Sequence, residues 1–215
     1  MINKEETISR LTAFQAELTD LGTQLNKLEA MGQVLSQDMI DCEQLIKARP
    51  EDEGVKRSFI RCVFALIEGS VFNLKETALT LAKHGRGKFS HGELAMLEEV
   101  SYDLGDKGEA REQPKFIQLT KNVRFAFSAA ARAFQVTYEL AVDDKEWSTF
   151  KDAIAIRNRI THPKSVDDLK LSDDEVQVVA DAGSWFLKNK HTLLQKFIDR
   201  MSVLKSALDK SPSAH

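Results

Sequence analysis

The chain has 215 residues, of which 42% are hydrophobic and 29% are charged, and its formal net charge is −3 at pH 7. That length is enough for one domain, or one domain with an appendage, and the composition is ordinary for a globular protein. The charge balance excludes a general nucleic-acid coat protein, whose affinity comes from a large positive excess, although a local basic patch is compatible with it.

The N-terminal residues are charged and lead into no apolar signal region, and no apolar run reaches the length of a membrane span. We therefore expect a cytoplasmic protein without a membrane partner. Cys42 and Cys62 lie on apolar helix faces without CxxC spacing, so buried thiols are expected rather than a disulfide or a zinc site. The pairs of aspartates precede helices, where capping is their expected role, and we expect neither a metal nor a cofactor.

The N-terminal segment predicts one long helix. Apolar residues recur at alternating steps of three and four from Leu11 to Ile46, and only Gly32 breaks this stripe. Such a repeat predicts a coiled-coil-like seam, kinked or weakened near Gly32, whose partner is either the chain's own bundle or another copy. Pro50, Gly54 and the charges between them mark a boundary. The domains expected are a long helix at 1–50, a helical bundle at 51–210 and a disordered tail at 211–215.

The second predicted helix, residues 55–83, is apolar around most of its circumference and should be central in the bundle. Glu68 is the exception on this surface. A carboxylate on an apolar face needs a cation, and Arg157 is the preferred candidate. The alternative is a glutamate at the edge of the core that reaches water or pairs with Arg61. Gly85 fits a left-handed cap at the end of the helix.

The middle of the chain reads as two helices around a loop. Ser90 and Glu93 form a capping box that opens a short helix to about residue 100. Residues 102–113 are polar and contain glycine, which favours a mobile flap. Pro114 is expected to start a helix that runs to about residue 140. We expect no strand.

Two further helices complete the expected fold, which is all-α. Asp143 or Asp144 should cap a helix that runs to about Thr161. Ser172 and Glu175 form a second capping box, which opens a last helix to about residue 208.

The end of the helix before residue 163 carries the residues with the most distinctive chemistry. Arg157 lies in line with an apolar helix face, where a permanent charge is seldom found without a partner or a ligand. Pro163 should end the helix near His162 and leave the imidazole free at its tip. Asn158, one helical turn before His162, is placed to orient a ring nitrogen.

This arrangement, Arg157-Asn158-x-x-x-His162, resembles the signature of the HEPN superfamily, and the resemblance extends over residues 55–208. HEPN proteins are small helical bundles, many of them metal-independent ribonucleases of toxin–antitoxin and antiphage systems. The resemblance implies an up-and-down helical bundle, to which this chain adds the long N-terminal helix. It also implies a homodimer whose paired motifs line a groove, RNA as substrate, products with 2′,3′-cyclic phosphate and 5′-hydroxyl ends, and an antitoxin or regulatory protein as a partner.

Metal-free cleavage of RNA needs a base for the 2′-hydroxyl, an acid for the leaving 5′-oxygen and a cation on the phosphate. Arg157 suits the phosphate because its planar fork donates two parallel hydrogen bonds, and His162 suits the acid or base role because an imidazole can both accept and donate a proton. Asn158 completes the expected catalytic set. One chain supplies one such histidine, and a two-fold dimer would supply two. Arg159 and Lys164 are candidates to hold neighbouring phosphates.

Two interpretations remain open from the sequence. The first is a dimeric metal-independent endoribonuclease, acting as a toxin or defence effector, with Glu68 supporting Arg157. The second is a non-catalytic interaction module of HEPN type that binds a partner through its N-terminal helix. In that case Arg157 is a structural arginine paired with Glu68 or a helix end, and His162 is a helix-end histidine that donates to free carbonyls.

Overall fold

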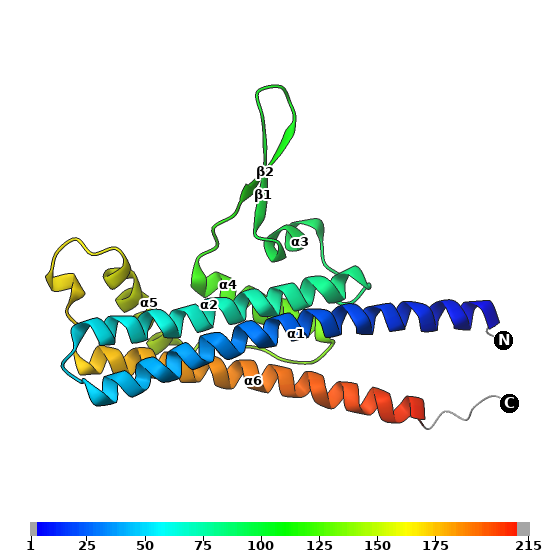
Figure 1. Cartoon of the computed structure of the whole chain (residues 1–215). Coiled ribbons are helices and arrows are strands. Elements are labelled where there is room, and N and C mark those ends of the chain that lie inside the picture. The colour runs from blue at the N-terminus through cyan, green and yellow to red at the C-terminus, as the bar shows by residue number, and fades with distance from the viewer. Residues whose placement is uncertain (1–3, 210–215) are drawn as a thin grey trace.

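The computed structural model of the chain describes residues 4–209 and shows a bundle of helices with one projecting hairpin (Figure 1). The prediction of an all-α helical bundle is confirmed. In chain order the elements are α1 (Lys4–Ala48), α2 (Glu53–Lys83), α3 (His91–Leu97), β1 (Val100–Leu104), β2 (Ala110–Pro114), α4 (Leu119–Phe134), α5 (Lys145–Thr161), the 3-10 turn η1 (Asp167–Leu169) and α6 (Asp173–Asp209).

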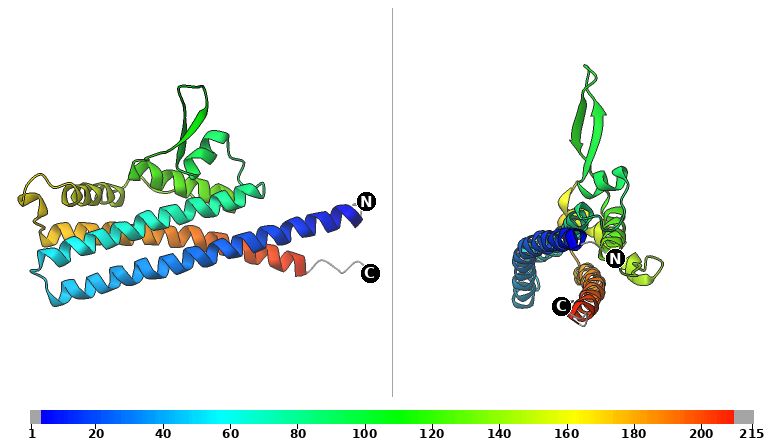
Figure 2. Two further views of the ribbon diagram at one scale, coloured as in Figure 1. Left: turned by 45° about the horizontal axis from the view of Figure 1, so that its top comes forward. Right: turned by 90° about the vertical axis from the view of Figure 1, so that its right-hand side faces the viewer.

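Helix α2 is the centre of the bundle, as its apolar circumference predicts. It packs against α1 along one side and against α4 and α6 on the others, while α5 packs on α6. Figure 2 shows the long helices α1, α2 and α6 running along the molecule, with α4 and α5 on the side that carries the hairpin. None of the helices within residues 4–209 is long and apolar enough to cross a membrane.

The core lies where α2, α4, α5 and α6 meet. Phe127 of α4 packs edge-on against Phe186 of α6 with 5.7 Å between ring centroids, and Trp147 and Trp185 join α5 to α6 at 5.5 Å. The small side chains in the middle of α4 let it approach α2 closely. The core residues with almost no exposure include Ile60, Phe64, Ile67, Val123, Ala126, Phe127, Ala129, Ala130, Phe150, Ile160, Phe186 and Leu193.

Helix α1 packs on its own bundle rather than standing free, and it continues through Gly32 without interruption. Leu21 and Leu28 of its seam are buried against the bundle, whereas Leu18 and Leu25 remain 42% and 38% exposed. The seam is therefore covered only in part by the chain itself.

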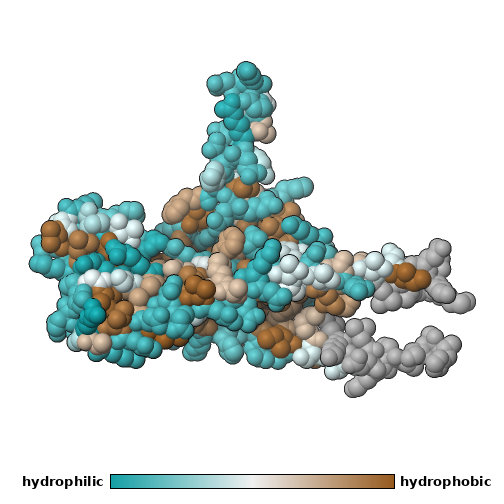
Figure 3. Space-filling model, viewed as in Figure 1, coloured by the Kyte–Doolittle hydropathy of each residue, from teal (hydrophilic) through white to brown (hydrophobic). Residues whose placement is uncertain are grey.

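The segment expected to be a flap is a β-hairpin, so the expectation that the chain has no strand was wrong. Strands β1 and β2 pair antiparallel, with Tyr102 opposite Glu112, and the hairpin projects from the bundle (Figures 1 and 2). Its turn contains Gly108 at φ +81°, a conformation that glycine adopts without steric cost. The surface of the projecting hairpin is mostly hydrophilic (Figure 3). The strands were missed because a two-stranded ribbon in water has little buried surface to impose a pattern.

The helix expected over residues 114–140 is shorter at both ends. Pro114 closes β2 instead of opening a helix, since proline without an N–H is tolerated at a strand edge as well as at a helix start. Helix α4 begins at Leu119 after an extended Gln118, and it ends at Phe134 because Gln135 adopts a left-handed conformation at φ 55°.

The predicted caps are confirmed. The Asp144 carboxylate accepts a hydrogen bond of 2.8 Å from the backbone N–H of Trp147 at the start of α5. The Ser90 capping box is present at α3, reciprocal hydrogen bonds join Ser172 and Glu175 at α6, and Gly85 has φ +76° just after α2. The tail predicted at 211–215 lies outside the described residues.

Candidate functional site

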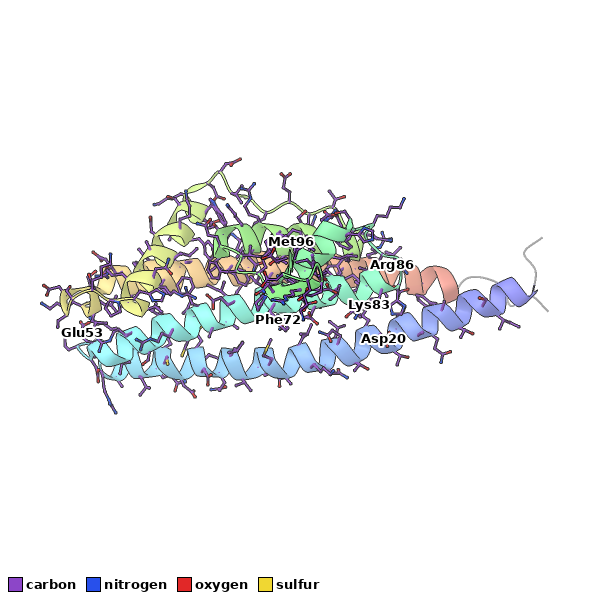
Figure 4. The ribbon with its side chains drawn as sticks, turned by 90° about the horizontal axis from the view of Figure 1, so that it is seen from above. Asp20, Glu53, Phe72, Lys83, Arg86 and Met96 are labelled. Atoms are coloured by element: carbon purple, nitrogen blue, oxygen red, sulfur yellow. The ribbon has the colours of Figure 1, made fainter. Side chains whose placement is uncertain are left out.

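A pocket of about 450 Å³ lies at the foot of the hairpin, where α2, α5 and the segment that joins β2 to α4 come together. Viewed from above in Figure 4, Phe72 of α2 lies beside the hairpin, which points toward the viewer. The lining residues are Glu68, Val71, Phe72, Glu99, Lys115, Phe116, Ile117, Gln118, Leu119, Thr120, Asn122, Ile154, Arg157 and Asn158. Two of the expected catalytic residues, Arg157 and Asn158, and the expected supporting residue Glu68 therefore share one cavity.

Arg157 is held on the pocket wall by three neighbours. Its Nη2 donates a hydrogen bond to Glu68 Oε1, the ion pair expected from the sequence, and its Nη1 donates to Asn158 Oδ1 at 3.1 Å. The guanidinium also lies over the Phe64 ring, 5.6 Å from the centroid. The Arg157 side chain is 27% exposed and that of Glu68 44%, so the pair is oriented by the fold and remains accessible from solvent.

A second charged cluster, which the sequence reasoning missed, borders the same pocket. Lys75 of α2 is fully buried, and its ammonium donates to Glu99 Oε1 at 2.7 Å and to Asn122 Oδ1 at 3.3 Å. Asn122 Nδ2 donates in turn to Glu99 Oε1 at 3.2 Å. The available signal was the spacing on α2, since Lys75 follows Glu68 by seven residues, or two helical turns, and so shares its face.

Burial and pairing shift the pKa values of this cluster. Burial lowers the pKa of Lys75, because the low-dielectric interior disfavours its charge more than Glu99 supports it. For Glu99, burial raises the pKa, but the hydrogen bonds from Lys75 and Asn122 outweigh it and leave the pKa below its usual value. The two directions agree with the geometry, because the Glu99 side chain is 43% exposed whereas Lys75 has no exposure. Glu99 is therefore ionised at neutral pH and neutralises the enclosed lysine.

His162 lies at the tip of α5 and does not line the pocket. It is exposed, has φ −124° and ψ 58°, and its backbone N–H donates to the Asn158 carbonyl at 3.0 Å. The expectation that the Asn158 side chain orients the imidazole was wrong, because that side chain accepts from Arg157 instead. The expected freedom of the imidazole fits this position, since none of the described residues makes a hydrogen bond to it.

The two residues expected to hold phosphates have different surroundings. Arg159 Nη2 donates to Glu175 Oε1 at 2.6 Å and its Nη1 donates to the Lys170 carbonyl at 3.2 Å, so it ties α5 to the start of α6. Both of its terminal nitrogens are therefore already engaged by protein groups. Lys164 is exposed, and its backbone N–H donates to Asp168 Oδ2 at 2.8 Å, which fixes the loop and leaves the ammonium in solvent.

The cysteines and carboxylates add no further site of this kind. The Cys42 and Cys62 sulfurs of α1 and α2 lie 3.3 Å apart as free thiols. Within residues 4–209 no three histidine, cysteine or acidic side chains are grouped closely enough to hold a metal ion.

No known family model matches the chain, and neither a curated protein nor a solved structure matches it. Functional assignment therefore rests on the residues of the site.

Proposed function

We propose that this chain is a metal-independent endoribonuclease of the HEPN type, a toxin or antiphage-defence effector that cleaves RNA at a groove between two copies. The observation that carries the proposal is the position of Arg157, which is fixed by Glu68 and Asn158 yet 27% exposed to solvent. A structural arginine could be sealed in the core. This one is accessible, and an exposed histidine ends the same helix five residues later.

In the proposed reaction the 2′-oxygen of a ribose attacks the adjacent phosphorus and the bond from phosphorus to the 5′-oxygen breaks. One His162 takes the 2′-hydroxyl proton, and His162 of the second copy protonates the leaving oxygen. Arg157 donates the N–H groups that Glu68 and Asn158 leave free to the phosphate oxygens as negative charge builds up on them, while those two residues hold the guanidinium in position. The products are a 2′,3′-cyclic phosphate and a 5′-hydroxyl end.

The test is cleavage of single-stranded RNA in excess EDTA by the parent protein and by the Arg157→Ala and His162→Ala variants. His191→Ala is the matched control, because His191 is an exposed histidine on α6 far along the sequence from α5. We expect cleavage by the parent and the control, cyclic-phosphate ends by mass spectrometry, and a loss of at least about 100-fold in each site variant. Equal activity in the parent and both site variants would contradict the proposal.

A second candidate function, binding of a partner protein through α1, is favoured by a different observation. A groove of about 790 Å³ between α1, α2 and α6 is lined mainly by apolar side chains, among them Leu25, Leu66 and Leu194. The partner tested is a second copy of this chain, which the sequence analysis names as a possible partner of the α1 seam. Under this alternative no RNA is cut, and Leu25→Glu, at a position 38% exposed, abolishes self-association measured by light scattering. An antitoxin or regulatory protein that restrains the proposed nuclease would fit the same groove.

A further inference from the structure

The exposed phenylalanines of this protein are concentrated at one place. Of the twelve phenylalanines in the chain, all of which fall within the described residues, only Phe72 and Phe116 are exposed, at 47% and 92%. Both line the pocket that contains Arg157. Exposed apolar side chains scattered singly need no explanation, but a pair of exposed aromatic rings lining one cavity that also holds charged side chains marks a binding site for a flat apolar group.

Other lining residues supply complementary polar groups. The carboxylates of Glu68 and Glu99 are each matched by their own cation, Arg157 and Lys75. Lys115, between β2 and α4, has no ion-pair partner among the described residues and adds the unmatched positive charge of the pocket.

Gln118 offers both a hydrogen-bond donor and an acceptor. It occupies the N-cap position of α4, but its side chain makes no capping hydrogen bond, so the amide is available to a ligand. An amide can pair with the edge of a nucleobase, which likewise presents donors and acceptors side by side.

The dimensions fit one nucleotide. A volume of about 450 Å³ is near the lower end of the roughly 300–1,000 Å³ typical of small-molecule sites, and too small for a folded partner. A base inside a duplex has both faces stacked and cannot lie on a phenylalanine, whereas an unpaired base can.

We propose that this pocket holds one unpaired nucleotide of single-stranded RNA, with its base stacked on Phe116 beside Phe72 and its phosphate held between Lys115 and Arg157. This subsite deepens the proposed function and rests on it. It places the base next to the guanidinium that would bind the scissile phosphate, and it makes single-stranded RNA the substrate class. In this proposal the pocket binds the nucleotide, whereas His162, which lies outside the pocket, transfers protons.

Binding is measured with the full-length His162→Ala variant, which keeps every pocket residue and, under the proposed function, does not cut the probe. The probes are a fluorescein-labelled uridine 12-mer, an adenosine 12-mer and a 12-base-pair RNA duplex, followed by fluorescence anisotropy. Adding Phe116→Ala should weaken binding of the single strands by about 5- to 140-fold, the range that corresponds to removal of one stacking aromatic, and leave the duplex unaffected.

Two matched variants make the comparison specific. Phe116→Trp retains an aromatic face and should bind within about two-fold of its parent, while Leu104→Ala removes a 74% exposed apolar side chain from the hairpin outside the pocket and should change nothing. Since Phe116 is 92% exposed, Phe116→Ala should melt at the parent temperature. Lys115→Gln should reduce the slope of log affinity against log salt by about 0.7, the value for one phosphate contact on a single strand.

The outcomes separate the subsite from the catalytic proposal. Binding that depends on Phe116, together with no cleavage by the parent protein, would retain the subsite and refute the nuclease. Suppose instead that the parent protein cleaves RNA, and that adding Phe116→Ala to the His162→Ala variant leaves its affinity for the single strands unchanged. This result would retain the nuclease and overturn the subsite. Absence of single-strand binding in the His162→Ala protein would also overturn it.

Discussion

Replacing Glu99 by glutamine should destabilise the protein more than replacing Lys75 by methionine, although each change breaks the same ion pair. The difference follows from the exposure of the residue left behind. Glu99→Gln leaves an ammonium with no exposure beside neutral amides, whereas Lys75→Met leaves a carboxylate that is 43% exposed and can regain water.

The magnitudes can be bounded. Breaking a buried ion pair by removing one partner costs about 3–5 kcal/mol, and we expect about 3 kcal/mol for Glu99→Gln because the amide oxygen still accepts from Lys75. The ceiling is about 5 kcal/mol at pH 7, the cost of deprotonating a lysine with an ordinary pKa of 10.5. For Lys75→Met, the exposure of Glu99 reduces the cost to about 1–2 kcal/mol.

The measurement is urea unfolding of the parent, both single variants and the double variant at pH 7, followed by circular dichroism. The double variant should cost less than the sum of the single variants by at least about 1 kcal/mol, because neither charge is then left unpaired. Equal costs for Glu99→Gln and Lys75→Met, or additive costs, would refute the reasoning. A change of about 3 kcal/mol corresponds to roughly 6–12 °C in Tm at this chain length.

The pH dependence supplies a second check on the same pair. The pKa of Glu99 is lowered in the folded protein, so the stability it contributes is present above the ordinary value of 4.5 and is lost as pH falls through the folded pKa. The difference in unfolding free energy between the parent and Glu99→Gln should therefore shrink as pH is lowered from about 5 toward 3.

Three further predictions concern other parts of the molecule. Glu68→Gln should lower RNA cleavage while costing less than about 1 kcal/mol in urea unfolding, because its pair with Arg157 is partly exposed; unchanged cleavage would remove Glu68 from the site. Burial raises the pKa of Cys62 to about 12, so in native protein at pH 8 its thiol beside Cys42 should react slowly with Ellman's reagent and quickly in urea; equal rates would contradict this. Asp144→Ala should cost about 1 kcal/mol in urea unfolding through loss of the α5 cap, and no measurable cost would contradict that role.

The features predicted correctly from the sequence are those set by neighbours along the chain. The caps at Ser90 and Asp144 depend on residues within one helical turn, and the central position of α2 follows from its own apolar surface. The pairing of Glu68 with Arg157 was also foreseeable, because a charge on an apolar helix face requires a partner and few were suitable.

The features that were missed depend on contacts between distant segments, or on residues whose type is compatible with two different local structures. Pro114 fits a helix start and a strand end equally well, and only the pairing of β1 with β2 decides between them. Lys75 shares a face with Glu68, but its partner Glu99 follows a short helix and adopts φ +56°, which no local pattern indicated. The contact of the Asn158 side chain with His162 was predicted from their spacing along the helix alone. In the structure the Asn158 side-chain oxygen accepts a hydrogen bond from the neighbouring Arg157 guanidinium.

Glu99 has two attachments that give the hairpin a mechanical property. Its backbone carbonyl accepts from the Lys115 N–H at 2.6 Å and closes the foot of the hairpin, while its side chain is anchored to Lys75 inside the bundle. Glu99 therefore connects the foot of the hairpin to the buried lysine of α2 and to the wall of the pocket. Movement of the hairpin that displaced Glu99 would change the shape of the pocket that contains Arg157.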